Sequence, residues 1–312
     1  MLMLFMSVAL ITQPAAIDPQ AYVDLLIDGE IDPIEFDYGV VRFPLDDLDR
    51  EAEWTRIQTH LTSLGTLINE PTEERSSEGL ICETTAIYRN RVVAEAATNY
   101  EEYRFALDEA LNWYQEYKQD SANELAVELE GDIDPVVEEI LERVYWDQAW
   151  RHAFSAFWGV EANGANADTI KSIMAMVEMC RVDIDNKVFV ESFLDQYGWP
   201  RISEYGEEAD RGLWLMLQHA DLDLQEAWLP ELERLWPEGE TNPRNYAMLY
   251  DRVMMRTDRP QRYGSQYSCV DGGMYEMYET EDAGNVDERR LAMGMNTVEE
   301  NGARFRDLSC GR

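Results

Sequence analysis

Lysine is nearly absent from this chain, and basic residues are far outnumbered by acidic ones. Three of the 312 residues are lysines, and 26 Lys and Arg stand against 63 Asp and Glu, which gives a formal net charge of −37 at pH 7. Such a charge repels phosphate backbones, so we expect no nucleic-acid partner. The acidity fits solubility or a salty habitat, and it also fits an acidic face that binds a cationic protein.

Several signatures of known chemistries are missing as well. The chain has no Gly-rich phosphate loop, no Gly-x-Ser-x-Gly elbow and no His-Glu-x-x-His motif. No segment approaches the run of about 18 apolar residues that a transmembrane helix needs, so we expect no membrane span. Residues that can fill a hydrophobic core are plentiful. The chain has 45% hydrophobic residues, nine Trp and sixteen Tyr, which indicates a folded globular protein.

Cysteine is scarce, and its four copies form no Cys-x-x-Cys pair, which disfavours a zinc knuckle or a thioredoxin-like centre. In an exported chain the four cysteines permit two disulfides in three possible pairings. We favour Cys269 with Cys310, which would tie down the C-terminal tail, and Cys82 with Cys180. In a cytosolic chain we expect four buried thiols instead.

The first residues are apolar from Met1 to Ile11 except for Ser7, and small residues follow at Ala15 and Ala16. This pattern is typical of a signal peptide, predicted at residues 1–16, and it implies export to the periplasm or the medium. No Lys or Arg precedes the apolar run. The alternative is a short buried helix or strand in a cytoplasmic protein.

Helical periodicity dominates the rest of the chain, and we predict a mainly α, multi-helical fold with one small C-terminal β-hairpin. A break at Gly131–Pro135 suggests an N-terminal helical region at 17–130 and a helical domain at 131–312, with Asp134 capping the helix that starts at Pro135. We expect two long helices between 80 and about 128, separated near Asn99, the second of them at 100–118. Further helices are expected at about 19–26, 48–64, 136–158, 168–180, 185–197, 243–256, 286–293 and 297–306. The hairpin is expected at 263–270 and 274–278, around Asp271-Gly272-Gly273.

Unusual polar motifs crowd the third quarter of the chain. They are Gly198-Trp199-Pro200, Gln218-His219-Ala220-Asp221, Asp251-Arg252-Val253 and Pro260-Gln261-Arg262-Tyr263-Gly264-Ser265-Gln266. Together with Tyr145-Trp146-Asp147-Gln148, Asp185-Asn186 and Val286-Asp287-Glu288-Arg289-Arg290, they resemble a bacterial domain family of unknown function over about residues 145–308. The family usually has Gly-Thr-Gln where this chain has Gly264-Ser265-Gln266. Residues 17–130 fall outside the resemblance, and the resemblance implies no activity.

His219 is the first candidate for chemistry, because the unperturbed pKa of an imidazole lies near neutrality. Asp251 or Asp221 would orient it as a catalytic partner. A structural alternative is a buried imidazole satisfied by a nearby carboxylate or backbone group. One histidine with carboxylates and no paired Cys or His is a thin ligand set, so we predict no metal site, and no cofactor is expected.

The neighbouring polar residues are candidates for ligand binding, and their structural alternatives are ion pairs and buried turn contacts. They are Gln218, Arg252, Gln261, Tyr263, Ser265 and Gln266. The first hypothesis is an exported binding domain whose polar cleft holds a small molecule or peptide. The second is a hydrolase that uses a His219–Asp dyad as general base. The third is an acidic structural protein that binds a cationic partner. The sequence determines neither the ligand nor the oligomeric state.

Overall fold

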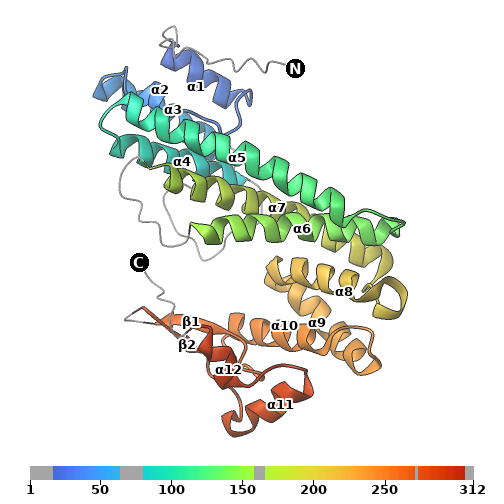
Figure 1. The fold of residues 1–312 in the computed structure, drawn as a ribbon. Coiled ribbons are helices and arrows are strands. Elements are labelled where there is room, and N and C mark those ends of the chain that lie inside the picture. Colours follow the sequence, from blue (N-terminus) through green and yellow to red (C-terminus); the bar gives the residue numbers. More distant parts are fainter. Residues whose placement is uncertain (1–16, 64–79, 158–165, 271–272, 306–312) are drawn as a thin grey trace, which may run out of the picture. The chain divides into compact units, whose positions relative to one another are not determined.

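The computed structural model describes residues 17–63, 80–157, 166–270 and 273–305 (Figure 1). In these residues the chain forms twelve α-helices and a single antiparallel pair of strands. The prediction of a mainly α fold with one small C-terminal hairpin is therefore confirmed. The expected signal peptide at 1–16 lies outside the described residues.

The chain divides into two compact units. The first comprises Met1–Glu116 and Val160–Val177. It holds α1 (Pro19–Ile27), α2 (Gly39–Arg42), α3 (Asp47–Ser63), α4 (Leu80–Ala96), the start of α5 (Tyr100–Glu128) and the start of α7 (Ala167–Tyr197). Its core contains Tyr38 and Trp54, whose rings meet edge to face with centroids 5.8 Å apart.

The second unit comprises Tyr117–Gly159 and Glu178–Arg312, and it carries every candidate site residue. Besides the ends of α5 and α7, its helices are α6 (Pro135–Ala156), α8 (Ile202–His219), α9 (Leu222–Leu235), α10 (Pro243–Arg256), α11 (Val286–Ala292) and α12 (Val298–Ala303). The strands are β1 (Tyr267–Val270) and β2 (Met274–Met277), and two 3-10 turns are η1 (Trp236–Glu238) and η2 (Ala283–Asn285). The predicted division at residue 130 stays a prediction.

Helices α6, α8 and α10 frame the candidate site. The helix predicted at 243–256 is α10: Asn242 caps it, accepting a hydrogen bond from the backbone N–H of Arg244 at 2.9 Å, and Pro243 occupies the first turn. Helix α6 packs against α8. A Cβ on Gly212 of α8 would lie 2.7 Å from Cγ2 of Ile140, so only glycine permits this close approach of the two helices.

Helix α7 departs from the prediction. We expected one helix at 168–180 and another from Asp185 or Asn186, but α7 runs without interruption from Ala167 to Tyr197. Asp185 and Asn186 favour helix starts, yet they terminate a helix only weakly in its interior. The segment contains no Gly or Pro, the residues that break helices most strongly, so the helix continues through both.

The hairpin pairs Tyr267 with Met277 and Val270 with Met274. Its first strand begins four residues later than predicted, because the backbone at 262–265 is bound to a side chain of α10, as described below. Cys82, Cys180 and Cys269 are disulfide-bonded, whereas Cys310 lies outside the described residues, and the preferred pairing stays a prediction. None of the described helices is long and apolar enough to cross a membrane.

Candidate functional site

The imidazole of His219 is held by a buried carboxylate from another helix. His219 is the last residue of α8, and its Nδ1 lies 2.9 Å from Oδ1 of Asp147 on α6. The Asp147 side chain has no exposed surface, whereas 19% of the His219 side chain is exposed. In the neutral ring a carboxylate at Nδ1 fixes the proton there, which leaves Nε2 as the basic nitrogen. The ring forms no other hydrogen bond within the described part of the chain.

Two further residues complete the surroundings of Asp147. Arg151, one turn along α6, contacts the Asp147 carboxylate through Nε at 3.3 Å and Nη2 at 3.2 Å. The same guanidinium also pairs with Asp183 of α7. Gln148 donates to Oδ2 of Asp147 at 2.6 Å. Asp147 is thus a buried anion with three side-chain partners, which fixes its orientation toward His219.

The pKa values of His219, Asp147 and Asp183 are shifted in different directions. Burial lowers the pKa of His219, and the charges of Arg151 and Arg252 act in the same direction, while Asp147 opposes them. Burial would raise the pKa of Asp147, but the hydrogen bonds and charges of His219 and Arg151 bring it down to about 2. Burial, assisted by Asp147, raises the pKa of Asp183 to about 7. At neutral pH the site therefore holds a neutral imidazole beside an ionised Asp147.

Arg252 is a guanidinium without a counter-ion. It lies on α10, its Nε is buried with no hydrogen-bond partner, and it forms no ion pair with any described residue. Burial lowers the pKa of Arg252, and the positive charges of Arg256 and Arg151 add to that effect. One turn further along α10, Arg256 donates to the carbonyl oxygen of Ala220, directly after His219, at 3.3 Å. The surroundings of His219 are thus rich in positive charge.

One group of possible metal ligands occurs among the described residues. Ligand atoms of Asp147, Asp183 and His219 lie within 4.8 Å of one another. In the structure, however, the cation that bridges the two carboxylates is the guanidinium of Arg151. A divalent ion would have to displace Arg151 and would lie near further guanidinium groups, which disfavours it electrostatically.

Asp251 was predicted as a partner of His219, but its carboxylate binds backbone N–H groups of the turn at 262–265 instead. Its fully buried carboxylate accepts backbone N–H groups of Arg262 at 2.7 Å, Tyr263 at 2.9 Å and Ser265 at 2.9 Å. Although these hydrogen bonds favour the ionised form, burial raises the pKa of Asp251. Asp251 therefore anchors the turn that precedes β1, and the structure does not bring it to the imidazole.

The other residues of that turn also satisfy one another. Gln261 is fully buried and accepts from the backbone N–H of Gln266 at 2.9 Å, and Gln266 donates to Oγ of Ser265 at 3.0 Å. Tyr263 packs between aromatic rings of α10, and the guanidinium of Arg290 donates to its carbonyl oxygen at 2.6 Å. Their hydrogen bonds are those of a rigid support, not of an open ligand surface.

The two remaining predicted residues flank His219 in sequence. Gln218 is buried at the end of α8, and its carbonyl oxygen accepts a hydrogen bond from Gln225 at 2.8 Å. Asp221 forms an ion pair with Lys187 at 2.5 Å. Of the predicted residues, the structure therefore groups His219 and Arg252, with Gln218 adjoining them, and separates them from the turn of Gln261, Tyr263, Ser265 and Gln266.

Sequence reasoning missed four members of the cluster, namely Asp147, Arg151, Asp183 and Arg256. Asp147 and Arg151 lie four residues apart inside an aromatic-rich helix, and that spacing is a detectable signal of an ion pair on one helix face. The pairing of Asp147 with His219 spans 72 residues, and no local pattern shows it.

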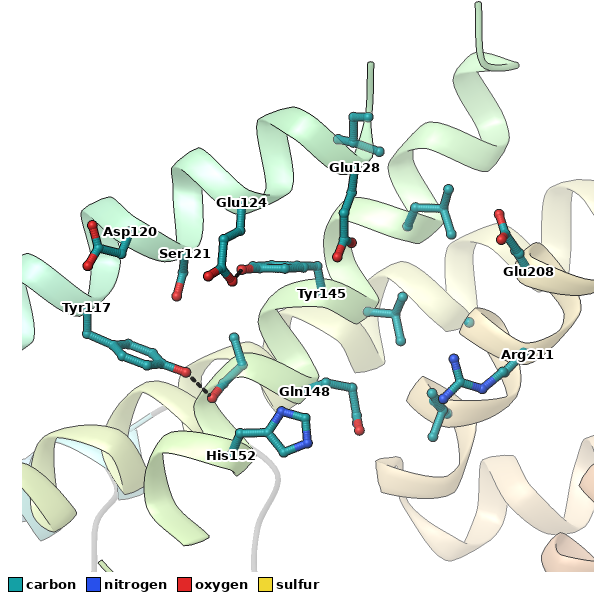
Figure 2. Close-up of a pocket in the computed structure, with 16 residues that line it drawn as sticks. Tyr117, Asp120, Ser121, Glu124, Glu128, Tyr145, Gln148, His152, Glu208 and Arg211 are labelled. Atoms are coloured by element: carbon teal, nitrogen blue, oxygen red, sulfur yellow. Dashed lines mark hydrogen bonds between the residues drawn. The ribbon is translucent and has the colours of Figure 1, made fainter. Parts of the chain in front are cut away.

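A hollow opens in the same unit, on a different group of side chains from the His219 cluster. It measures about 950 Å³ and lies among α5, α6 and α8 (Figure 2). Carboxylates line much of it, and Tyr145 donates to Glu124 at 3.0 Å. The labelled lining residues are Tyr117, Asp120, Ser121, Glu124, Glu128, Tyr145, Gln148, His152, Glu208 and Arg211. Gln148 links this groove to the His219 cluster, because its amide contacts Asp147.

Comparison with known proteins gives a family and no activity. A family model described as a family of unknown function (DUF6624) matches residues 136–309, more than half of the chain. No curated protein and no solved structure matches the chain. The expected resemblance to a domain family of unknown function is confirmed.

Proposed function

Since the chain belongs to DUF6624, a family of unknown function, we propose its function from the site itself: an enzyme in which His219 is the general base toward a small bound substrate. The observation that carries this proposal is the pairing of Nδ1 with the buried Asp147 carboxylate while Nε2 has no partner among the described residues. Because part of the His219 side chain is exposed, water can reach Nε2, as a general base requires.

The chemistry that fits this geometry is hydrolysis. Nε2 takes a proton from a water molecule, and the water oxygen bonds to the electrophilic atom of the substrate. As the bond to the leaving group breaks, the imidazolium returns the proton to that group. Asp147 stabilises the transient imidazolium, and Arg252 stabilises the negative charge that develops on the substrate. The lowered pKa of His219 keeps the base form available at neutral pH.

Binding without turnover is the second candidate, and the unpaired guanidinium of Arg252 favours it specifically. A cation in that position attracts an anionic ligand whether or not a reaction follows. Under this alternative His219 would contribute a hydrogen bond and no proton transfer. A ligand would then stabilise the wild type against heat without being consumed.

An activity panel of ester, peptide and glycan substrates tests the proposal. We expect His219→Gln to reduce the rate by roughly 10²- to 10⁴-fold, the usual contribution of a general base. Asp147→Asn is expected to slow the reaction too, because it removes the charge that stabilises the imidazolium. His60→Gln, on α3 in the first unit, is the matched control. Equal rates for the wild type and His219→Gln would refute a general-base role.

We also propose that the protein is exported. The disulfide-bonded state of Cys82, Cys180 and Cys269 supports this, because disulfides persist in oxidising compartments. Fractionation of a bacterial host that expresses the full chain is the test. Recovery of the protein in the cytoplasm with its N-terminal residues intact would contradict export.

A further inference from the structure

The positive charge around His219 is unusual for this chain. With a formal net charge of −37, the protein has an abundance of carboxylates that could pair with arginines. Other arginines of the second unit do pair in this way: Arg234 contacts Glu231 at 2.6 Å and Glu238 at 3.2 Å. Arg252 has no such partner among the residues that the structure describes, although its Nε is buried.

Burying part of a guanidinium without a counter-ion is costly, because the loss of hydration is not offset. Arg252 and Arg256 are four residues apart on α10 and therefore lie on the same helix face. Arg256 reaches Ala220 next to His219, which places this face beside the end of α8. The guanidinium groups of Arg252 and Arg256 thus lie near the imidazole of His219.

The side chains around His219 carry an excess of positive charge, which an anionic ligand would balance. Arg151 is already paired with Asp147 and Asp183, and the contact of Arg256 is to a neutral carbonyl oxygen. Three guanidinium groups, those of Arg151, Arg252 and Arg256, thus stand against two carboxylates, an excess of one positive charge that grows as Asp183 takes up a proton. A phosphate group carries about −1.5 to −2 charges at pH 7, and its oxygens match the planar fork of arginine.

We propose that the site binds a substrate through a phosphate group, which Arg252 holds directly and Arg256 supports. This inference rests on the proposed function in one respect, because it names the substrate class of the same site. The probe for a first test is inorganic phosphate alone. It is added to the full chain at about 20 mM, against sodium chloride of equal ionic strength, and the Tm is followed by thermal unfolding.

For the wild type we expect phosphate to raise the Tm by at least about 2 °C beyond chloride, a shift typical of a moderately occupied site in a protein of this size. In Arg252→Met this increment is expected to vanish. Because Arg252→Met removes a partly buried, unpaired charge at similar side-chain volume, the variant should also have a higher Tm than the wild type without phosphate. A structural arginine would give the opposite result, a lower Tm.

Arg234→Gln is the matched control, since it removes one positive charge from an arginine whose guanidinium is paired at the surface of α9. It should keep the full phosphate increment. Arg252→Lys, which retains the charge but loses the planar fork, should keep part of it. Calorimetric titration of phosphate into the wild type and Arg252→Met provides a direct measurement of the same difference.

The outcomes separate this inference from the proposed function. No phosphate increment in the wild type, or an equal increment in Arg252→Met, would overturn the phosphate site. If His219→Gln still abolished hydrolysis of an uncharged substrate, the general base would stand without it. Phosphate binding that depends on Arg252, in a protein without activity on phosphate esters, would support the site and remove the catalytic role.

Discussion

At the residue scale, the pairing of His219 with Asp147 makes a direct prediction about the imidazole. The Asp147 carboxylate raises the pKa of His219 against the effect of burial. Asp147→Asn removes that negative charge and keeps an acceptor oxygen, so the pKa of His219 should fall further below its ordinary value. The chain has only three histidines, and an NMR titration of their ring protons can follow each one. An unchanged or higher pKa for His219 in the variant would show that the pair does not form.

Asp183 makes a prediction about stability and pH. Its folded-state pKa of about 7 lies above the unfolded value, so between pH 4 and 7 the unfolded chain releases a proton that the folded chain retains. This weakens the wild type as the pH rises through that window. The free energy of unfolding of Asp183→Asn, relative to that of the wild type, should therefore rise between pH 4 and pH 7. We expect a rise of about 1 to 2 kcal/mol after allowance for partial exposure, and no further rise above pH 7. Urea unfolding of both proteins at pH 4.5, 6 and 8 measures the difference. A flat or declining difference would contradict the raised pKa.

Asp251 has a structural role that differs from the catalytic one expected of it. Its carboxylate holds three backbone N–H groups of the turn at 262–265. Asp251→Asn turns part of that acceptor into a donor, and we expect a loss of about 2 to 4 kcal/mol in the free energy of unfolding. Denaturant titration checks the loss. The pKa of His219 should stay as in the wild type, and a shift of that pKa would restore the predicted link between the two residues.

Sequence reasoning identified the two residues whose chemistry is visible in isolation. His219 stands out because histidine is rare here, and Arg252 because a charged residue in an apolar helix needs a partner. Their partners come from helices distant in sequence, and only packing decides which carboxylate reaches the ring. The sequence pointed to Asp221, two residues from His219, and to Asp251 on a later helix, whereas the acid that reaches the ring is Asp147.

At the scale of elements, helix starts were the most predictable features. Asp134 caps α6 as expected, and Asn242 caps α10 at the predicted start, because a short polar side chain followed by proline satisfies the first N–H groups locally. The continuity of α7 was missed, since Asp185 and Asn186 have the same local preference but lie in the middle of a helix. A cap is decided by neighbouring residues, whereas helix continuation depends also on packing along the whole element.

The cap of α10 matters for the site, because this helix carries both Asp251 and Arg252. Asn242→Ala leaves the N–H of Arg244 without its acceptor and should lower the free energy of unfolding by about 1 kcal/mol. Asn242→Asp, which keeps the acceptor and adds a favourable charge at the helix start, should restore it. Chemical denaturation of the three proteins compares them. If both variants lost stability equally, the side-chain cap would not be the cause.

At the scale of the whole molecule, composition predicted the class of fold and not its assembly. Amphipathic periodicity indicated a multi-helical chain, and the Asp271-Gly272-Gly273 turn indicated the hairpin. Which helices contribute to each unit was not predictable, because α5 and α7 each supply residues to both units. Such a division depends on long-range packing, which a single sequence does not display.

The net charge of −37 makes a final prediction about salt. Like charges repel more strongly in a compact chain than in an expanded one, so the acidic excess opposes folding. Sodium chloride shortens the Debye length from about 14 Å at 0.05 M to about 4 Å at 0.5 M and screens this repulsion. We therefore expect the Tm to rise steadily over that range, measured by thermal unfolding at pH 7. Arg252→Met should show the same slope, because screening acts over the whole surface. A slope lost in this variant would mean that chloride acts by binding at Arg252, and a falling Tm would mean that favourable ion pairs outweigh the repulsion.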